Sequence, residues 1–553
     1  MTHWERPQAG LEPAATALLG WLADSRAPRL CLISGSEGCG KSTLLAWLVL
    51  HGSQEEHAAE RTVHAAVPNV GNSVLGLVWA IAGQLDVVAR APGELLEILA
   101  ADARRTVIVV PDLSSGSSAQ FVRSLTRLPH LRLIIETRTG SAAHLALAGE
   151  GCAELDLDLE HWWDRQRYEA WRTTNHTASV ARPAPSEISE QLDLADPASV
   201  CAADPWLITA LYEGDSSNDH EGLRTAWLKA GHSLCRDQPP ASRALVLLTT
   251  IGEGCDPRLL AALTALSGDA PWRVDWARMK GNVTPPWPGP VTAMTVGSGP
   301  LGGCVLTADQ LGTVRALHAE DASARGRLRS PTTDISGMSV LSDGTVLILD
   351  GAGRIYADKT WTTLVHSNTR TSARGEPDET QALVKALHVY AGTALTSSPG
   401  PRRMIALGDA SGTVRAFGDL PGTVALHEGR VTALAALDVP AASGTTAHML
   451  YSGGADGAIR VWSPGQEPIP VPIEERTCPV VALHATWSAE GPILAVAWGD
   501  GLVQLHCPAR DERLGFRPGV PVRAVTAMAD RSLILGMDQA VVRLAAHSGV
   551  YKT

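Results

Sequence analysis

The sequence predicts a multidomain protein in which an α/β region with a parallel sheet is followed by a helical region and an all-β region. In residues 1–160, short apolar runs alternate with helix-like spacing, which indicates buried strands separated by helices. Residues 161–280 keep the helix-like spacing without the strand alternation. Residues 281–553 consist of short β-type runs between Gly and Asp turns, and these units repeat. We therefore expect three domains with these boundaries.

The first region contains apolar runs as long as a buried strand, separated by segments with helical spacing. Such fully apolar strands belong to parallel sheets whose two faces are both covered by helices. The expected strands are 29–34, 62–67, 106–110 and 131–135, and the expected helices are 11–23, 41–51, 73–85 and 93–103.

The second region is expected to be helical, with helices at 223–235, 242–250 and 258–266. A proline-rich run at 284–290 follows it. Because such a density of prolines is incompatible with a helix or a central strand, this run is expected to separate the helical region from the third one.

A turn-plus-strand unit recurs in the third region at intervals of roughly 40–45 residues, with one longer interval. Four short strands per interval are the period of a propeller blade, so we expect an all-β propeller of six blades. The longer interval, 355–412, holds a polar insertion at 366–381 and leaves room for a seventh blade. The units begin at Gly312, Gly353, Gly412, Gly457, Gly501 and Ala540.

The last blade shows only three strands in the sequence and ends at about Ser548. A closed ring removes the exposed edges of its sheets. We therefore expect the segment Trp272–Trp276, which precedes the repeats, to supply the outer strand of this blade.

Composition excludes several classes of function. The formal net charge is −12 and no run of five or more Lys or Arg residues occurs, so binding of nucleic acid is not expected. The nine cysteines form no Cys-x-x-Cys pair, which argues against a disulfide framework or a zinc site and favours a cytoplasmic location. Apolar runs are much shorter than the ~20 residues of a membrane span, so no membrane association is expected.

The strongest motif is the run Gly35-Ser36-Glu37-Gly38-Cys39-Gly40-Lys41-Ser42, which lies between an apolar strand and a helix. Glycines at these positions let the backbone N–H groups turn toward phosphate, and the helix N-terminus adds partial positive charge. Lys41 is expected to contact the β- and γ-phosphates, and the Ser42 hydroxyl to bind Mg²⁺. With Thr43, these residues predict a site for ATP or ADP with Mg²⁺ in a P-loop NTPase domain.

A second Mg²⁺-side group is expected from an acidic residue at the end of an apolar strand. Asp112, after the run 107–110, is the candidate; the alternative is a simple strand-ending turn. No carboxylate follows Asp112 to orient an attacking water, so ATP hydrolysis is expected to be slow or absent. Catalytic residues stay unknown. Glu136 could supply the missing carboxylate, and Arg138 could contact the γ-phosphate or be a solvated surface arginine.

These elements resemble the STAND class of signal-transduction NTPases, and most of all the actinobacterial branch that joins such a module to WD repeats. The resemblance implies a winged-helix segment within 161–280 and a protein that holds ADP at a cleft and opens when ATP replaces it. It is carried by Gly35–Ser42, Val63–Val67, Val107–Asp112, Thr137-Arg138, Asp204–Leu207, Ala226-Trp227 and Ala244–Leu248.

The repeats resemble WD repeats, most clearly around Asp456. The resemblance implies a buried hydrogen-bonded network of His427, Ser452, Asp456 and Trp462 with a structural role. In the other blades, Asp500 and Asp538 keep the turn aspartate, whereas Asp309, Asp350 and Asp409 are displaced by two residues.

Two functions follow from these patterns. The first is a molecular switch in which nucleotide state controls domain arrangement or assembly, including nucleotide-dependent homo-oligomers, while the propeller binds a partner protein or peptide. Its output would pass through a separate effector protein, and the resemblance implies a role in bacterial signalling or defence. The alternative is an interaction scaffold whose NTPase module holds nucleotide but hydrolyses it weakly.

Overall fold

The computed structural model describes residues 10–52, 61–67, 73–102, 104–149, 151–175, 192–251, 255–279, 290–360, 379–400, 404–440 and 446–547. They form two compact units, Met1–Gln238 (the N-terminal unit) and Pro239–Thr553 (the C-terminal unit). The boundary falls inside the region predicted to be helical, and the three-domain division stays a prediction. Residues 284–289 of the proline-rich run and 366–378 of the polar insertion lie outside the described residues.

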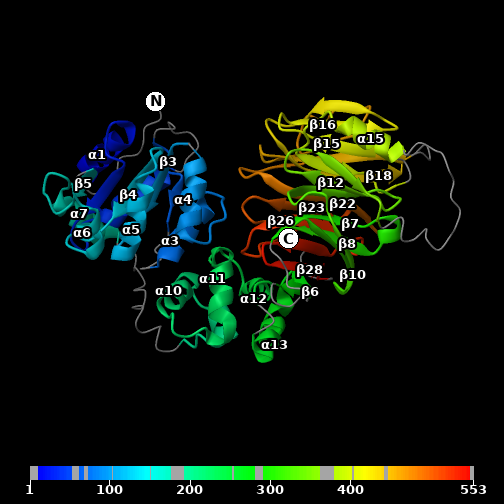
Figure 1. The fold of residues 1–553 in the computed structure, drawn as a ribbon. Coiled ribbons are helices and arrows are strands. Elements are labelled where there is room, and N and C mark those ends of the chain that lie inside the picture. The colour runs from blue at the N-terminus through cyan, green and yellow to red at the C-terminus, as the bar shows by residue number, and fades with distance from the viewer. Residues whose placement is uncertain are drawn as a thin grey trace. The chain divides into compact units, whose positions relative to one another are not determined.

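The N-terminal unit is built on a parallel five-stranded sheet in the order β2-β3-β4-β1-β5 (Figure 1). Every residue of β1, β3 and β4 is buried, as expected for a sheet covered on both faces. The predicted parallel sheet is therefore confirmed, with β5 as an additional strand. The strands are β1 (Leu30–Ser34), β2 (Ala65–Ala66), β3 (Thr106–Val110), β4 (Leu131–Glu136) and β5 (Cys152–Asp156).

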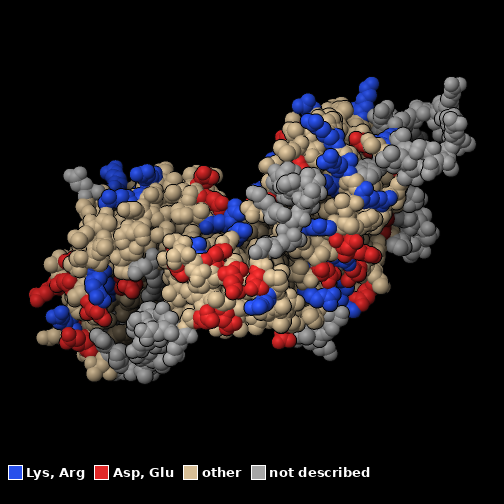
Figure 2. Space-filling view, turned by 60° about the horizontal axis from the view of Figure 1, so that its bottom comes forward, with Lys and Arg blue, Asp and Glu red and all other residues tan. Residues whose placement is uncertain are grey.

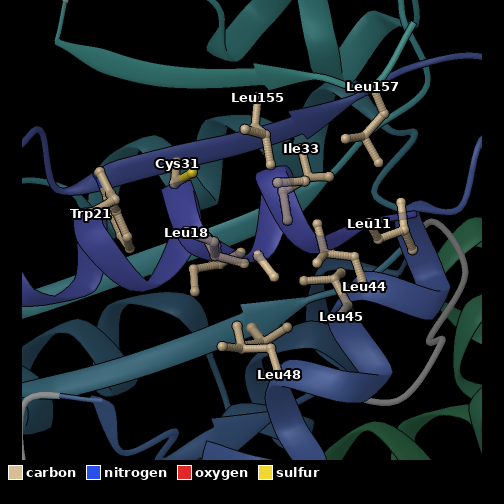
Figure 3. Packing of buried hydrophobic residues seen from close by; sticks show 14 of the residues in the cluster. Leu11, Leu18, Trp21, Cys31, Ile33, Leu44, Leu45, Leu48, Leu155 and Leu157 are labelled. Carbon is tan, nitrogen blue, oxygen red and sulfur yellow. The ribbon is translucent and has the colours of Figure 1, made fainter. Parts of the chain in front are cut away.

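Helices α1 and α2 cover one face of this sheet. Figure 3 shows Leu18 of α1 and Leu44 and Leu48 of α2 gathered with Ile33 of β1 and Leu155 of β5 in one apolar cluster. Burial of such side chains contributes about 1.5–3 kcal/mol each, so this cluster anchors α2 to β1 and fixes the loop between them. The helices are α1 (Glu12–Ala23), α2 (Lys41–Gly52), α3 (Val74–Gln84), α4 (Pro92–Ala101), α5 (Gly116–Leu125), α6 (Ala142–Leu147) and α7 (Arg165–Asn175).

The described residues of the N-terminal unit contain three further helices, α9 (Pro197–Ala202), α10 (Pro205–Gly214) and α11 (Leu223–Leu234), and α10 and α11 contact α3. Asp204 begins α10 as an N-cap, its carboxylate accepting from the backbone N–H groups of Trp206 and Leu207. Glu213 of α10 accepts a 2.6 Å hydrogen bond from the hydroxyl of Ser73, the N-cap of α3. The bond between Ser73 and Glu213 therefore joins α10 to α3.

Close contact between α3 and α11 requires glycine at position 231. A Cβ there would lie 2.1 Å from the ring of Trp79, which is 2% exposed. We expect Gly231→Ala to lower the free energy of unfolding by about 1–3 kcal/mol, because the core must shift to admit the methyl group. Gly20→Ala is the matched control: its Cβ would meet open space on helix α1, so it should stabilise by about 0.5–1 kcal/mol.

Chemical denaturation of both variants, followed by circular dichroism, checks this prediction. If Gly231→Ala proves neutral, the described contact between Trp79 and α11 is wrong.

The C-terminal unit begins with α12 (Pro240–Leu248) and α13 (Pro257–Leu266), and α12 contacts strand β6. Six antiparallel sheets follow. Their innermost strands contact one another in a ring in the order β7, β11, β14, β18, β22 and β26, the last returning to β7. This is a six-bladed β-propeller, and the described residues of the interval 355–412 contain no seventh sheet.

Each blade has its strands in the following order, from the innermost to the outermost. They are β7 (Val291–Val296), β8 (Cys304–Asp309), β9 (Thr313–His318) and β10 (Ala324–Arg329); β11 (Ile335–Val340), β12 (Val346–Asp350) and β13 (Ile355–Asp358); β14 (Ala394–Ser397), β15 (Met404–Gly408), β16 (Thr413–Gly418) and β17 (Gly422–Ala425); β18 (Val431–Pro440), β19 (Thr446–Gly454), β20 (Ala458–Trp462) and β21 (Glu474–Glu475); β22 (Val480–Ser488), β23 (Gly491–Trp498), β24 (Val503–Cys507) and β25 (Glu512–Phe516); and β26 (Val522–Ala527), β27 (Leu533–Met537), β28 (Ala540–Ala546) and β6 (Trp272–Met279). Helix α15 (Glu379–Leu387) lies between β13 and β14 in the chain.

The last blade is closed by β6, which pairs with β28 from Ala546↔Trp272 to Ala540↔Met279. The prediction that the segment beginning at Trp272 supplies this strand is confirmed, and the strand extends to Met279. The Trp272 side chain is fully buried, and its indole N–H donates to the carbonyl of Gly515 in β25 of the neighbouring blade. The ring is thus closed by a segment that precedes all the repeats.

The predicted network around Asp456 is present for three of its four members. His427 contacts the Asp456 carboxylate through Nδ1 at 3.0 Å and the Ser452 hydroxyl through Nε2 at 2.9 Å. The prediction for the fourth member, Trp462, was wrong, because its indole N–H donates to the carbonyl of Gln466 instead. Its ring packs over Gly422 of the preceding blade, where a Cβ would lie 2.9 Å away.

In several other blades, arginine takes the place of histidine as the partner of the aspartate. Asp309 pairs with Arg315 and Asp409 with Arg415, each within one hairpin. Asp500, fully buried, pairs with both Arg476 and Arg517. Because a carboxylate removed from water is costly without partners, these pairs explain how blades without the histidine keep an aspartate at or near the turn.

Candidate functional site

The loop between β1 and α2 has the backbone conformation that its glycines permit. Gly35, Gly38 and Gly40 have φ values of +146°, +81° and +97°, which other residues rarely adopt. A Cβ at Gly35 would also lie 2.6 Å from the Cys39 sulfur, and one at Gly40 would lie 3.2 Å from the ring of Tyr168. Both conformation and space therefore require glycine at 35 and 40.

Lys41, the first residue of α2, is folded back into this loop. Its side chain is buried, and Nζ donates to the carbonyl oxygens of Gly35 at 2.9 Å and Ser36 at 2.7 Å. The first turn of α2 contains no acidic residue. The positive end of the helix and the ammonium group thus act together at the loop, which is the electrostatic arrangement that binds phosphate.

Ser42 is bonded to the end of strand β4. Its hydroxyl donates to Glu136 Oε1 at 2.8 Å. Glu136 is 4% exposed, and burial raises the pKa of its carboxyl group, although the Ser42 hydrogen bond and the Lys41 charge act in the opposite direction. Its second oxygen, Oε2, is buried without a hydrogen-bond partner among the described residues.

Asp158 holds the other side of the loop. Its carboxylate accepts from the backbone N–H of Ser36 at 2.9 Å and from the Ser36 hydroxyl at 2.6 Å. The hydrogen bond from the Ser36 side chain is the main reason that the pKa of Asp158 lies below its ordinary value. Asp158 was not predicted from the sequence, because β5, the strand that it follows, lacks a fully apolar pattern.

The remaining predicted residues lie around this centre. Glu37 and Arg138 form an exposed ion pair at 3.0 Å, and the Thr43 hydroxyl lies 3.2 Å from that of Tyr168 in α7. Asp112 follows β3 and is exposed, with a φ of +45°. It lies close to Glu136: its charge raises the pKa of that carboxyl group, and its nearby backbone N–H acts in the opposite direction.

Phosphate and a divalent cation fit the residues that are present. The loop and Lys41 offer donors to phosphate, while the Ser42 hydroxyl and the unpartnered Oε2 of Glu136 are hard oxygen ligands of the kind that Mg²⁺ prefers. Within the described ranges, no group of three or more His, Cys, Asp or Glu side chains could hold a metal ion alone. Mg²⁺ commonly takes one or two protein groups together with phosphate oxygens, so this set suits a metal–nucleotide complex.

The propeller encloses a central cavity of about 270 Å³ between its innermost strands. Its lining mixes small polar and apolar side chains, including Thr292, Ser339, Leu434 and Leu483. On the face shown in Figure 2, acidic and basic side chains are interspersed with uncharged ones.

No protein-family model matches this chain, and no curated protein matches it. Among solved structures it is similar to the WD40 repeats of RRP9, with 12% identity and a TM-score of 0.32, covering 50% of this chain and 98% of that one. It is similar to the structure of U3-55K with the same identity and TM-score, covering 50% of this chain and 99% of that one. The propeller assignment above rests on the strand pairings of the chain itself.

No helix in the described part of the chain combines the length and the apolar character needed to cross a bilayer.

Proposed function

We propose that this chain is a nucleotide-responsive interaction protein. Its N-terminal unit binds ATP or ADP with Mg²⁺, and its propeller binds a partner protein or peptide. The observation that carries the proposal is the loop 35–40, in which three glycines with positive φ lead into α2 while the Lys41 ammonium is held inside the loop. A buried lysine is costly unless its charge is used or paired, and a phosphate chain would use it.

The predicted residues take specific roles in this proposal. Gly35 to Thr43 would hold the phosphates, Ser42 the Mg²⁺ ion, and Asp112 would lie on the metal side. Hydrolysis is slow or absent in this proposal, because no carboxylate follows Asp112 in the segment Leu113–Ser118. The proposal includes membership of the STAND class and a cytoplasmic location. It also includes a separate effector protein, nucleotide-dependent homo-oligomers and a role in bacterial signalling or defence.

The alternative function is an interaction scaffold whose NTPase module holds nucleotide but hydrolyses it weakly. It is favoured by the number of protein groups already bonded to the loop and to the first turn of α2: Asp158 to Ser36, Glu136 to Ser42 and Tyr168 to Thr43. Such bonds would hold the loop in one conformation whichever nucleotide is present.

Titration calorimetry and small-angle scattering on the full chain separate these functions. The purified protein is first denatured to identify any nucleotide that it carries, and nucleotide-free protein is then titrated with ATP and ADP in Mg²⁺. Binding in roughly the micromolar range is expected. A switch requires the scattering profile or the molar mass to differ between the two complexes; identical profiles and masses support the scaffold. If neither nucleotide binds, the proposed function is wrong.

A further inference from the structure

Two carboxylates compete for the metal side of the candidate nucleotide site. The sequence pattern favours Asp112 because it follows an apolar strand, and it offers Glu136 only as a catalytic group. Strand order bears on this choice. β4 lies directly beside β1, with Glu136 opposite Ile33, while β3 is one strand further away.

Strand spacing translates this order into distance. Neighbouring strands are separated by about 4.8 Å, so the end of β4 lies about 5 Å from the end of β1 and the end of β3 about 10 Å away. Of β3 and β4, the nearer strand is the one whose carboxylate bonds to the first turn of α2, through the 2.8 Å hydrogen bond from Ser42 to Glu136. Asp112 is instead exposed at the surface, and its backbone has a left-handed conformation.

The bonding of Glu136 leaves one oxygen free. Oε1 accepts from the Ser42 hydroxyl, and Oε2 is buried without a partner in the described structure. A buried acceptor that lacks a partner costs about 1–3 kcal/mol, so this arrangement needs a reason. When Ser42 donates its proton to Glu136, the lone pairs of the serine oxygen stay available to a cation, and Oε2 offers a second oxygen beside it.

We propose that Glu136 is the carboxylate that completes the divalent-cation site beside Ser42, supplying Oε2 to Mg²⁺ or to one of its water molecules. The inference rests on the proposed function, since the other ligands of the ion would be nucleotide phosphates. Glu136 is in this view a metal-binding residue, and its role is distinct from that of a base that activates water.

The experiment measures how much Mg²⁺ strengthens ATP binding. ATP is titrated into nucleotide-free full-length protein with Mg²⁺ and, separately, with EDTA, for the natural protein and for Glu136→Gln. The glutamine can still accept from Ser42 but is a neutral, poorer metal ligand. Loss of a group of this kind typically weakens metal binding 10–100-fold, so the enhancement by Mg²⁺ should fall at least tenfold. Affinity in EDTA should stay the same or rise, because a negative charge near the phosphates is gone.

Two further variants serve as controls. Glu97→Gln changes an exposed carboxylate on α4 and should keep the full enhancement. Glu136→Asp keeps the negative charge on a shorter side chain and should keep part of the enhancement by Mg²⁺. If the glutamine variant does not fold, the aspartate variant is used for the test. Thermal denaturation without nucleotide establishes that each variant is folded.

The inference is overturned if Glu136→Gln retains the enhancement, and equally if Asp112→Asn abolishes it while Glu136→Gln does not. These outcomes leave ATP binding by the natural protein intact. Absence of ATP binding by the natural protein is a different result, which refutes the proposed function itself.

Discussion

Replacing Lys41 by alanine is expected to weaken ATP binding by about two orders of magnitude or more. A hydrogen bond to a charged partner contributes about 1.5–3 kcal/mol, and a P-loop lysine makes more than one such contact with phosphate oxygens. A loss of about 3 kcal/mol corresponds to a factor of more than 100 in Kd. The geometry supports the role, because the buried Nζ already lies at the loop, 2.7–2.9 Å from two of its carbonyl oxygens.

Calorimetric titration of the full chain measures this effect, and Lys229→Ala is the matched control. Lys229 is an exposed lysine on α11 of the same unit, so its removal should leave Kd within about twofold. Because Lys41→Ala also removes donors from the carbonyls of Gly35 and Ser36, its melting temperature without nucleotide must be measured in parallel. A folded Lys41→Ala protein that binds ATP as tightly as Lys229→Ala would show that the loop does not hold phosphate.

The loop could be predicted because its information is contiguous in the chain. Predicted strand 29–34 and helix 41–51 are observed as Leu30–Ser34 and Lys41–Gly52, within one residue at each end. Fully apolar strands and a glycine-rich connection are local patterns, and they need no knowledge of distant residues.

The partners of the loop could not be predicted in the same way. Asp158 and Glu136 reach the loop from 122 and 94 residues away in sequence, through the pairing of β5 and β4 with β1. β5 reads Cys-Ala-Glu-Leu-Asp and buries only Leu155 fully, so it lacks the apolar signature of its neighbours. An edge strand is half exposed, and its composition resembles that of a loop.

The propeller shows the same division between local and distant information. The number of blades was predictable from the period of the sequence repeat. The closing strand at Trp272 was predictable because a closed ring leaves no open sheet edge. The bond of Trp462 to Gln466 was not, because it depends on how the indole ring packs over Gly422 in the neighbouring blade. Motif spacing identifies which residues are close in the chain, and packing between blades decides which atoms they contact.

The candidate nucleotide site and the closure of the propeller ring depend on different residues. The loop depends on β1, β4, β5 and α2, while the ring depends on β6 and β28. A variant that weakens one is therefore expected to spare the other, which makes each unit an internal control for the other in full-length protein.

Replacing Trp272 by alanine is expected to lower the free energy of unfolding of the propeller by about 3–5 kcal/mol. The side chain is fully buried, so its truncation leaves a large cavity, and it also leaves the Gly515 carbonyl without its indole donor. Trp272 begins the strand that pairs with all of β28, so the loss should loosen that pairing before other blades unfold. Chemical denaturation of the full chain gives the magnitude, and hydrogen exchange of residues 540–546 shows where the ring opens.

Trp487→Ala is the matched control, because Trp487 is 37% exposed and contributes chiefly one hydrogen bond to the Asp438 carbonyl. Its cost should be about 1 kcal/mol. In Trp272→Ala, the amides of β28 should exchange faster than those of β24, a strand held inside another blade, while ATP binding by the N-terminal unit stays unchanged. Equal losses in the two tryptophan variants, or unaltered protection of β28, would mean that β6 does not close the ring, and the propeller would then have to keep its last blade together with three strands alone.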